Sequence, residues 1–283
     1  KHPKIFDDLF VNLVAAGEMG GILDTFFINL AASTEKSMKL KAKVKGAMKY
    51  PVTVLIVALG ITYGLLTSVI PTFGGMFKSM GKKELPAITE FMMALSDRAT
   101  AAMPYIITGI IIFIIAYNRF VSTPKGRLMA DTFYIKMPLF GTLIRKTAVA
   151  KFTRTLGTLI SSGVPILDSL DIVARTAGNK VVENAVLYTK DKIAEGKSIA
   201  APMMETGIFP KMVVQMIGVG ESTGAMDVML SKIADFYDDE VDQAVENLTS
   251  MLEPMIMLFL GIVVGGFVIA MYLPIFTMAQ SIG

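Results

Sequence analysis

Three stretches of the chain are long and apolar enough to cross a lipid bilayer, which takes about 20 mostly apolar residues. The first uncharged run is Val52–Ile70, the second covers 99–118, and the third begins at Met255. Elsewhere apolar positions recur with the period of α-helices, and no alternation typical of strands is sustained. The pattern predicts an all-α membrane protein. Its transmembrane helices are expected at 51–73, 99–118 and 254–277.

The two outer spans belong to a repeated unit. A shift of 203 residues aligns "GEMGGILD" with "GESTGAMD" without a gap. The same shift places a proline before and after each outer span, and these are the predicted membrane-boundary residues Pro51, Pro71, Pro254 and Pro274. The chain is therefore expected to hold two repeated cytoplasmic helical bundles, each followed by a span. The first bundle is incomplete, so we expect roughly 50–60 similar residues upstream of Lys1.

The distribution of Lys and Arg predicts the orientation, because cytoplasmic flanks carry an excess of these residues. Six lysines precede the first span and several cations follow the second, so both flanks are expected in the cytoplasm. Residues 1–50 then end the first cytoplasmic domain, and 119–253 form a second one with six helices. The middle span makes the return crossing, as in other same-sense repeats. Segment 74–98, a loop with a short helix after Pro86, and the tail 278–283 are expected outside.

The composition excludes several function classes. Hydrophobic residues make up 53% of the chain, and the net charge of +3 gives no reason to expect nucleic acid. The chain has no Cys and one His, so no thiolate or His-rich metal site, and no cofactor, is expected. The motif "EGKS" at Glu195–Ser198 lacks the first glycine of a phosphate loop, because Asp191 stands there. Any ATP must therefore be used by a partner.

Several motifs occur doubled and in order. They are "KFTRTLGTLISSGVPILDSLDIVA", "GES-G-MD", "EP" and "LPIF" in the second copy, "GE--G-LD", "YP" and "IPTF" in the first, and "LPAIT" between the first two spans. Together they resemble the polytopic inner-membrane platform proteins of type IV pilus and type II secretion machines, the PilC/GspF family. The resemblance implies a non-enzymatic protein of the bacterial inner membrane. Its implied partners are hexameric cytoplasmic assembly and retraction ATPases, pilins, other inner-membrane alignment proteins, membrane lipids and further copies of the same chain.

The repeated Gly-Glu phrase supplies the first candidate partner-binding residues: Gly17, Glu18, Gly21, Asp24, Gly220, Glu221, Gly224 and Asp227. Each Glu is expected to open a helix that carries the Asp. In one interpretation these acids stabilise helix N-termini, which expose free N–H groups and partial positive charge. In the other, they lie on a face that contacts the ATPase or another subunit.

The two helices that lead into the outer spans carry opposite charges. Residues 35–51 hold six lysines against one glutamate, and 238–254 hold six acids with no cation. Either the basic helix attracts anionic lipid headgroups while the acidic helix is solvated, or the two helices face each other, within one chain or between protomers. Such exposed ion pairs would add little stability, but they would fix the register between the two helices. The candidate pairing residues are Lys39, Lys43, Asp239, Asp242 and Glu246.

Two glycine pairs in the outer spans have the small-xxx-small spacing that lets helix backbones approach closely. They are Gly60 with Gly64, and Gly261 with Gly265. The sequence therefore predicts tight helix packing at these positions.

The predicted function is that of a type IV pilus platform, which couples the cytoplasmic ATPases to insertion or extraction of pilins. A type II secretion platform that drives pseudopilus assembly is the alternative, and nothing in the sequence separates the two. A small transporter or channel agrees less well, because no span contains the charged residue that usually marks an ion or substrate path.

Overall fold

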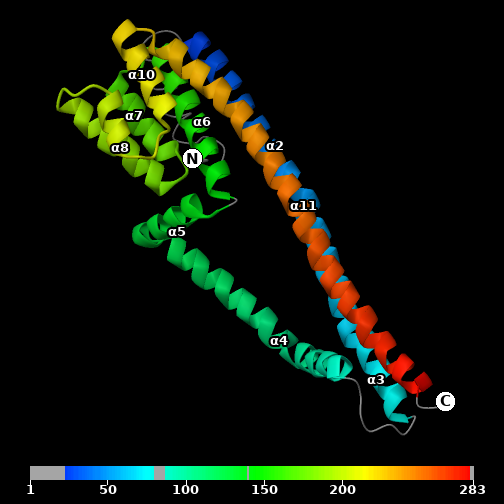
Figure 1. Ribbon diagram of the computed structural model, residues 1–283. Coiled ribbons are helices and arrows are strands. Elements are labelled where there is room, and N and C mark those ends of the chain that lie inside the picture. The colour runs from blue at the N-terminus through cyan, green and yellow to red at the C-terminus, as the bar shows by residue number, and fades with distance from the viewer. Residues whose placement is uncertain (1–22, 80–86, 139, 281–283) are drawn as a thin grey trace. The chain divides into compact units, whose positions relative to one another are not determined.

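A computed structural model describes residues 23–79, 87–138 and 140–280 (Figure 1). These residues form helices and contain no strand, which confirms the all-α class. The helices are α2 (Leu23–Gly64), the π-helical turn η1 (Leu65–Val69), α3 (Ile70–Ser79), α4 (Ala87–Val121), α5 (Pro124–Lys136), α6 (Phe140–Ser161), α7 (Ile166–Thr176), α8 (Lys180–Ala194), α9 (Ala200–Glu205), α10 (Lys211–Thr223) and α11 (Met226–Gln280). Three helical segments, Thr34–Gly75, Ala87–Val121 and Met226–Leu273, are long and apolar enough to cross a membrane. The prediction of three membrane-spanning helices is thus confirmed, and their exact limits in the bilayer stay a prediction.

The chain divides into two compact units. The bundle unit comprises Lys1–Lys45 and Phe120–Leu248, and the membrane unit comprises Gly46–Arg119 and Thr249–Gly283. Both α2 and α11 contribute residues to each unit. The division points in these two helices lie 203 residues apart, which equals the shift that aligns the two copies of the repeat.

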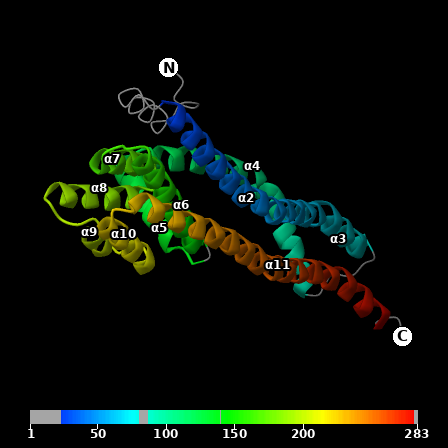
Figure 2. The same cartoon turned by 90° about the horizontal axis from the view of Figure 1, so that it is seen from above.

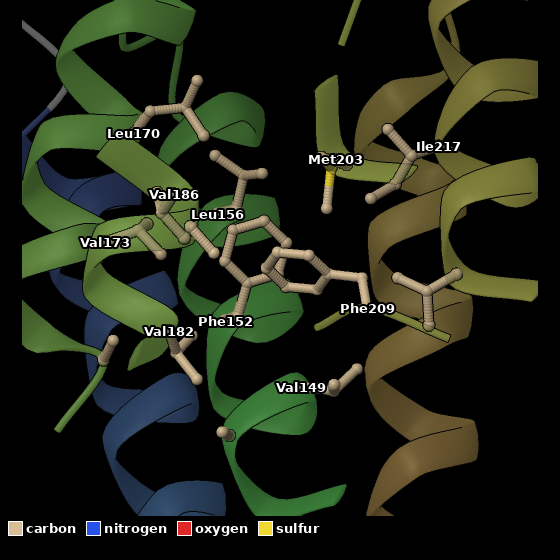
Figure 3. Packing of buried hydrophobic residues seen from close by; sticks show 14 of the residues in the cluster. Val149, Phe152, Leu156, Leu170, Val173, Val182, Val186, Met203, Phe209 and Ile217 are labelled. Carbon is tan, nitrogen blue, oxygen red and sulfur yellow. The ribbon is translucent and has the colours of Figure 1, made fainter. Parts of the chain in front are cut away.

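The core of the bundle unit forms around α6. Its apolar positions recur at helical spacing, and Val149, Phe152, Leu156 and Leu159 are each at most 1% exposed. The rings of Phe152 and Phe209 lie 4.8 Å apart between their centroids. Figure 3 shows the two rings together at the centre of the cluster. The face of α6 that carries these apolar residues is therefore the buried one.

The start of α8 is fixed by side chains that accept its free N–H groups. Asn179 is the N-cap and accepts from the backbone of Val181 and Val182 with N···Oδ1 distances of 2.9 and 3.3 Å. Asp131 of α5 accepts from the backbone N–H of Lys180 at 2.6 Å. The second contact ties α5 to the bundle.

In the membrane unit, the helical segment that ends in η1 and α3 lies beside the second half of α11 (Figures 1 and 2). Leu66 and Ile70 pack with Phe267 in a small apolar cluster. These contacts join the first copy of the repeat to the second within the membrane unit.

The segment before the middle span differs from the expectation. The sequence predicts a short helix inside the external loop 74–98, but α4 is one helix from Ala87 to Val121, and 74–79 belong to α3. No Gly or Pro interrupts 87–103, and alanines favour helix there, so nothing ends the helix before the apolar run. The first turns of α4 pack on the neighbouring helices, where Met92 and Met93 contribute to the apolar cluster.

Candidate functional site

Two ion pairs join α2 to α11 within the bundle unit. Lys36 Nζ lies 3.0 Å from Asp235 Oδ1, and Lys43 Nζ contacts Asp242 Oδ2. We call these four residues the cross-repeat seam. Each pair joins positions 199 residues apart, so the two helices run in the same direction. Because the repeat shift is 203, the two copies lie about four residues out of register, roughly one helical turn.

Arg154 of α6 supports the seam from the core side. Its side chain is only 10% exposed, and its Nη2 lies 3.4 Å from Asp235 Oδ1 and also contacts Asp238 Oδ2. A buried guanidinium needs acidic partners to offset the loss of hydration. Arg154 was not a candidate from the sequence. The sequence signal that could have identified it is a cation at position 154, between the buried apolar positions of α6.

The two acids beside Arg154 have opposite pKa shifts. Burial opposes ionisation of Asp235, but the hydrogen bonds and charges of Lys36 and Arg154 outweigh it and hold its pKa below the ordinary value. Burial of Asp238 outweighs the attraction of Arg154 and raises its pKa. Asp235 is therefore the more firmly ionised partner in the seam.

A cavity of about 510 Å³ adjoins the seam within the bundle unit. Its lining from α2 is Ala32 and Lys36, from α6 it is Thr153, Arg154, Gly157, Thr158 and Ser161, and from α11 it is Asp227, Val228, Ser231, Lys232, Ala234 and Asp235. Both copies of the repeat thus contribute to one cavity. Across the described ranges, no cluster of three or more potential metal-ligating side chains occurs.

The other candidate charges lie outside the seam. Lys39 pairs within α2, where its Nζ is 2.6 Å from Glu35 Oε1. Among the residues that the structure describes, Asp239 and Glu246 form no ion pair with another side chain. Of the five candidates, only Lys43 and Asp242 pair with each other.

Glu221 of the second Gly-Glu phrase lies at a different place from the one expected. Glu221 does not open a helix; it lies in the last turn of α10, which ends at Gly224 with a left-handed φ of 73°. Its carboxylate accepts the backbone N–H of Ile199, with N···O distances of 2.9 and 3.0 Å. Ile199 precedes α9 and has no side chain of its own to cap that helix. The acid thus stabilises a helix N-terminus, as in one of the two interpretations, but on another helix.

The rest of the phrase forms the corner between α10 and α11. Gly220 is buried, and a Cβ there would lie 3.1 Å from the Cα of Met226. Asp227 lies in the first turn of α11, where an acid complements the helix dipole. In the first copy, Asp24 lies within α2, and Gly17, Glu18 and Gly21 lie outside the described residues.

The boundary prolines lie within continuous helices. Pro51 is inside α2, Pro71 follows η1, and α11 passes through Pro254 and Pro274. Proline has no N–H, so each leaves a carbonyl four residues earlier without its helical donor. Their coincidence with the membrane surfaces stays a prediction.

Two different contacts accommodate the second proline of each copy. Pro274 frees the carbonyl of Ala270, and the buried Thr89 hydroxyl of α4 donates to that oxygen at 2.8 Å. In the first copy, the π-helical turn η1 lies directly before Pro71, and the Ile70 N–H bonds to the carbonyl of Leu65. Both are known ways to keep a proline inside a membrane helix.

The glycine pairs do not make close contacts within the described chain. A Cβ built on Gly60, Gly64, Gly261 or Gly265 would meet no atom of another described helix within 4 Å. Close approach occurs elsewhere, since a Cβ on Gly266 would lie 3.4 Å from Met92 Cε. Tight packing at the two glycine pairs stays a prediction for helices of other subunits.

Comparison with known proteins identifies the family of the chain. The family model described as "Type II secretion system (T2SS), protein F" matches residues 1–71 and 152–274, which is more than half of the chain. The chain belongs to this family. The family predicted from the motifs is thereby confirmed. The two matched stretches end 203 residues apart, at Pro71 and Pro274.

Curated relatives of the family carry both kinds of name. The chain is 56% identical to "Type IV pilus assembly protein PilC" of Myxococcus xanthus over 282 residues, which cover 100% of this chain and 67% of the relative. It is 46% identical to the protein of the same name from Thermus thermophilus, covering 98% and 68% of the two chains. Identity to "Type II secretion system protein F" of Vibrio cholerae is 33%, again covering 98% and 68%.

Proposed function

We propose that this chain is the inner-membrane platform protein of a type IV pilus machine. The observation that carries the proposal is the 56% identity to a type IV pilus assembly protein across the whole chain. The corresponding identity to a type II secretion protein F is 33%. The platform would couple cytoplasmic assembly and retraction ATPases to insertion or extraction of pilins, without catalysing a reaction itself.

The helices shared by the two units give the proposal a mechanical basis. Residues of α2 and α11 belong to both the bundle unit and the membrane unit, so a force on the bundle can travel along two helices. The cross-repeat seam joins these helices where they belong to the bundle unit. In this proposal, the seam makes the two helices respond together when an ATPase acts on the bundle.

The orientation follows from the charge pattern. The bundle unit would lie in the cytoplasm, because its flanks carry the Lys and Arg excess. The spans of α2 and α11 would then cross in the same direction, and the C-terminus would lie outside. This orientation would put the bundle on the side where ATP is available to a partner.

Gene deletion followed by complementation tests the proposed function. The deletion strain should lose surface filaments and keep normal secretion of folded exoproteins, and the gene in trans should restore the filaments. Capture of the tagged protein from solubilised membranes should also recover a hexameric ATPase and a pilin. Lost secretion with normal pili would assign the chain to a type II secretion machine instead.

A further inference from the structure

Helix α5 presents two large apolar side chains to the surroundings of the bundle unit. Met129 is 64% exposed and Phe133 is 63% exposed. They are four residues apart, so they lie on one face of the helix. The two side chains therefore form a small exposed apolar patch on this face.

Contacts on the other side of α5 fix which face points outward. Asp131 accepts from the Lys180 backbone N–H at 2.6 Å and is held at the start of α8. At about 100° per residue, Asp131 lies about 160° around the helix from both Met129 and Phe133. The exposed pair therefore points away from the bundle.

The entry into α5 is also fixed. Thr123 caps the helix by accepting from the Gly126 N–H at 3.1 Å. A Cβ on Gly126 would lie 2.1 Å from the carbonyl oxygen of Phe120, so the end of α4 is packed directly against the first turn of α5. The helix cannot rotate to bury its apolar pair without breaking this corner.

The chain places α5 close to the end of a membrane span. The uncharged run of α4 ends at Asn118, and α5 begins at Pro124. The residues between cover on the order of 15 Å, so α5 starts within reach of the headgroup layer.

Cations flank the apolar pair along one stripe. Lys125, Met129, Phe133 and Lys136 follow each other at spacings of four, four and three residues, and all four are exposed. Neighbouring acids do not neutralise the stripe, because Asp131 faces α8. Along this stripe, the apolar pair can enter lipid while the lysines on either side of it attract anionic headgroups.

We infer that α5 lies in the headgroup layer of the membrane, with Met129 and Phe133 inserted and with Lys125 and Lys136 bound to anionic phospholipid headgroups. Through Asp131, the same helix holds the start of α8, so α5 fixes the bundle to the lipid surface. The inference depends on the membrane spans and is independent of which secretion or pilus machine uses the chain.

The absence of tryptophan from the chain allows a direct test. A Phe133→Trp variant, reconstituted in nanodiscs with brominated phosphatidylglycerol, should show blue-shifted emission that the bromines quench. The matched control is Met204→Trp on α9, which is 55% exposed and lies in no basic stripe. It should emit as a water-exposed indole and remain unquenched. Met129→Trp provides a second reporter on the inferred face, in case the first variant fails to fold.

The lipid charge and the lysines are tested in the same assay. Phosphatidylcholine nanodiscs should give weaker quenching of the Phe133→Trp reporter than phosphatidylglycerol nanodiscs do. Adding Lys125→Glu and Lys136→Glu should reduce the quenching in phosphatidylglycerol, whereas Lys211→Glu on α10 should leave it unchanged. Equal quenching in both lipids would overturn the anionic-lipid assignment. A water-exposed reporter in nanodiscs would overturn the inference, and protection that appears only in native membranes would assign the face to a protein.

Discussion

The Glu221 carboxylate satisfies a backbone N–H of a helix to which it does not belong. Glu221→Ala should lower the free energy of unfolding by about 1 kcal/mol, because α9 loses the acceptor for its Ile199 N–H. Glu221→Gln should lose less, since its amide oxygen can still accept. Thermal unfolding in detergent measures both. The control is Glu246→Ala, an exposed acid that forms no ion pair among the described residues; an equal loss there would contradict the capping role.

The two acids beside Arg154 should respond to pH in opposite directions. The pKa of Asp235 is lowered from 3.8 in the folded state, so its charge contributes stability above the unfolded pKa, and this is lost as pH falls through the folded pKa. The pKa of Asp238 is raised, so ionising it costs stability as pH rises from 3.8 through the folded pKa.

Melting curves of the Asp235→Asn and Asp238→Asn variants from neutral pH to about pH 3 measure this difference. The deficit of Asp235→Asn relative to the parent should shrink in acid. The parent should gain stability relative to Asp238→Asn over the same range. Parallel profiles for the two variants would contradict the assigned shifts.

Residue roles could be predicted from the sequence only in part. The repeat singled out Glu221 as a structural or binding residue. The helix that Glu221 caps could not be predicted, because Ile199 lies 22 residues earlier and meets it only through packing. Arg154 was missed for the same reason, since its acidic partners are on α11.

Helices α2 and α11 are paired by charge, and reversal of one charge should disturb the pairing. Lys43→Glu places a like charge against Asp242 and should reduce surface piliation, counted by electron microscopy. The swap Lys43→Glu with Asp242→Lys should restore it. Lys41→Glu is the matched control, because Lys41 forms no ion pair within the described chain. If the control and the seam variant lose piliation equally, the Lys43–Asp242 pair does not fix the register between α2 and α11.

In the membrane unit, Thr89 holds α4 to α11 by donating to the carbonyl that Pro274 leaves free. Thr89→Val should destabilise the protein by roughly 1 kcal/mol, because the buried carbonyl loses its donor. Thr89→Ser keeps the hydroxyl and should retain most of the stability. Unfolding by detergent titration measures the stability of both variants. Thr108→Val removes only a hydrogen bond within α4 and should have little effect on stability. If it lowers stability as much as Thr89→Val does, Thr89 does not stabilise the contact between α4 and α11.

The helices themselves were largely predictable, because apolar periodicity and capping residues are local signals. The continuity of α4 was not predicted, since Pro86 and the charges at Asp97 and Arg98 look like the edges of a separate loop helix. The offset of one helical turn between the two helices of the seam could not be predicted from the sequence either. The repeat aligns Lys43 with Glu246, whereas the ion pair joins Lys43 to Asp242.

On the scale of the whole molecule, the account depends on two copies of a unit whose outer spans cross in the same sense. Within the bundle unit, the seam shows that the copies run in parallel, and Leu66 packs with Phe267 within the membrane unit. The repeat predicted this direction from the sequence. The lysine and arginine pattern predicts the side of the membrane on which each end lies.

Labelling of single cysteines tests this arrangement most directly, because the chain has no cysteine of its own. Lys82→Cys and Gly283→Cys, in cells whose outer membrane has been removed, should react with an impermeant maleimide. Ser198→Cys in the bundle unit should react only after the inner membrane is permeabilised. If the cysteines at 82 and 283 react from opposite sides, the two outer spans do not cross in the same direction and the account is wrong.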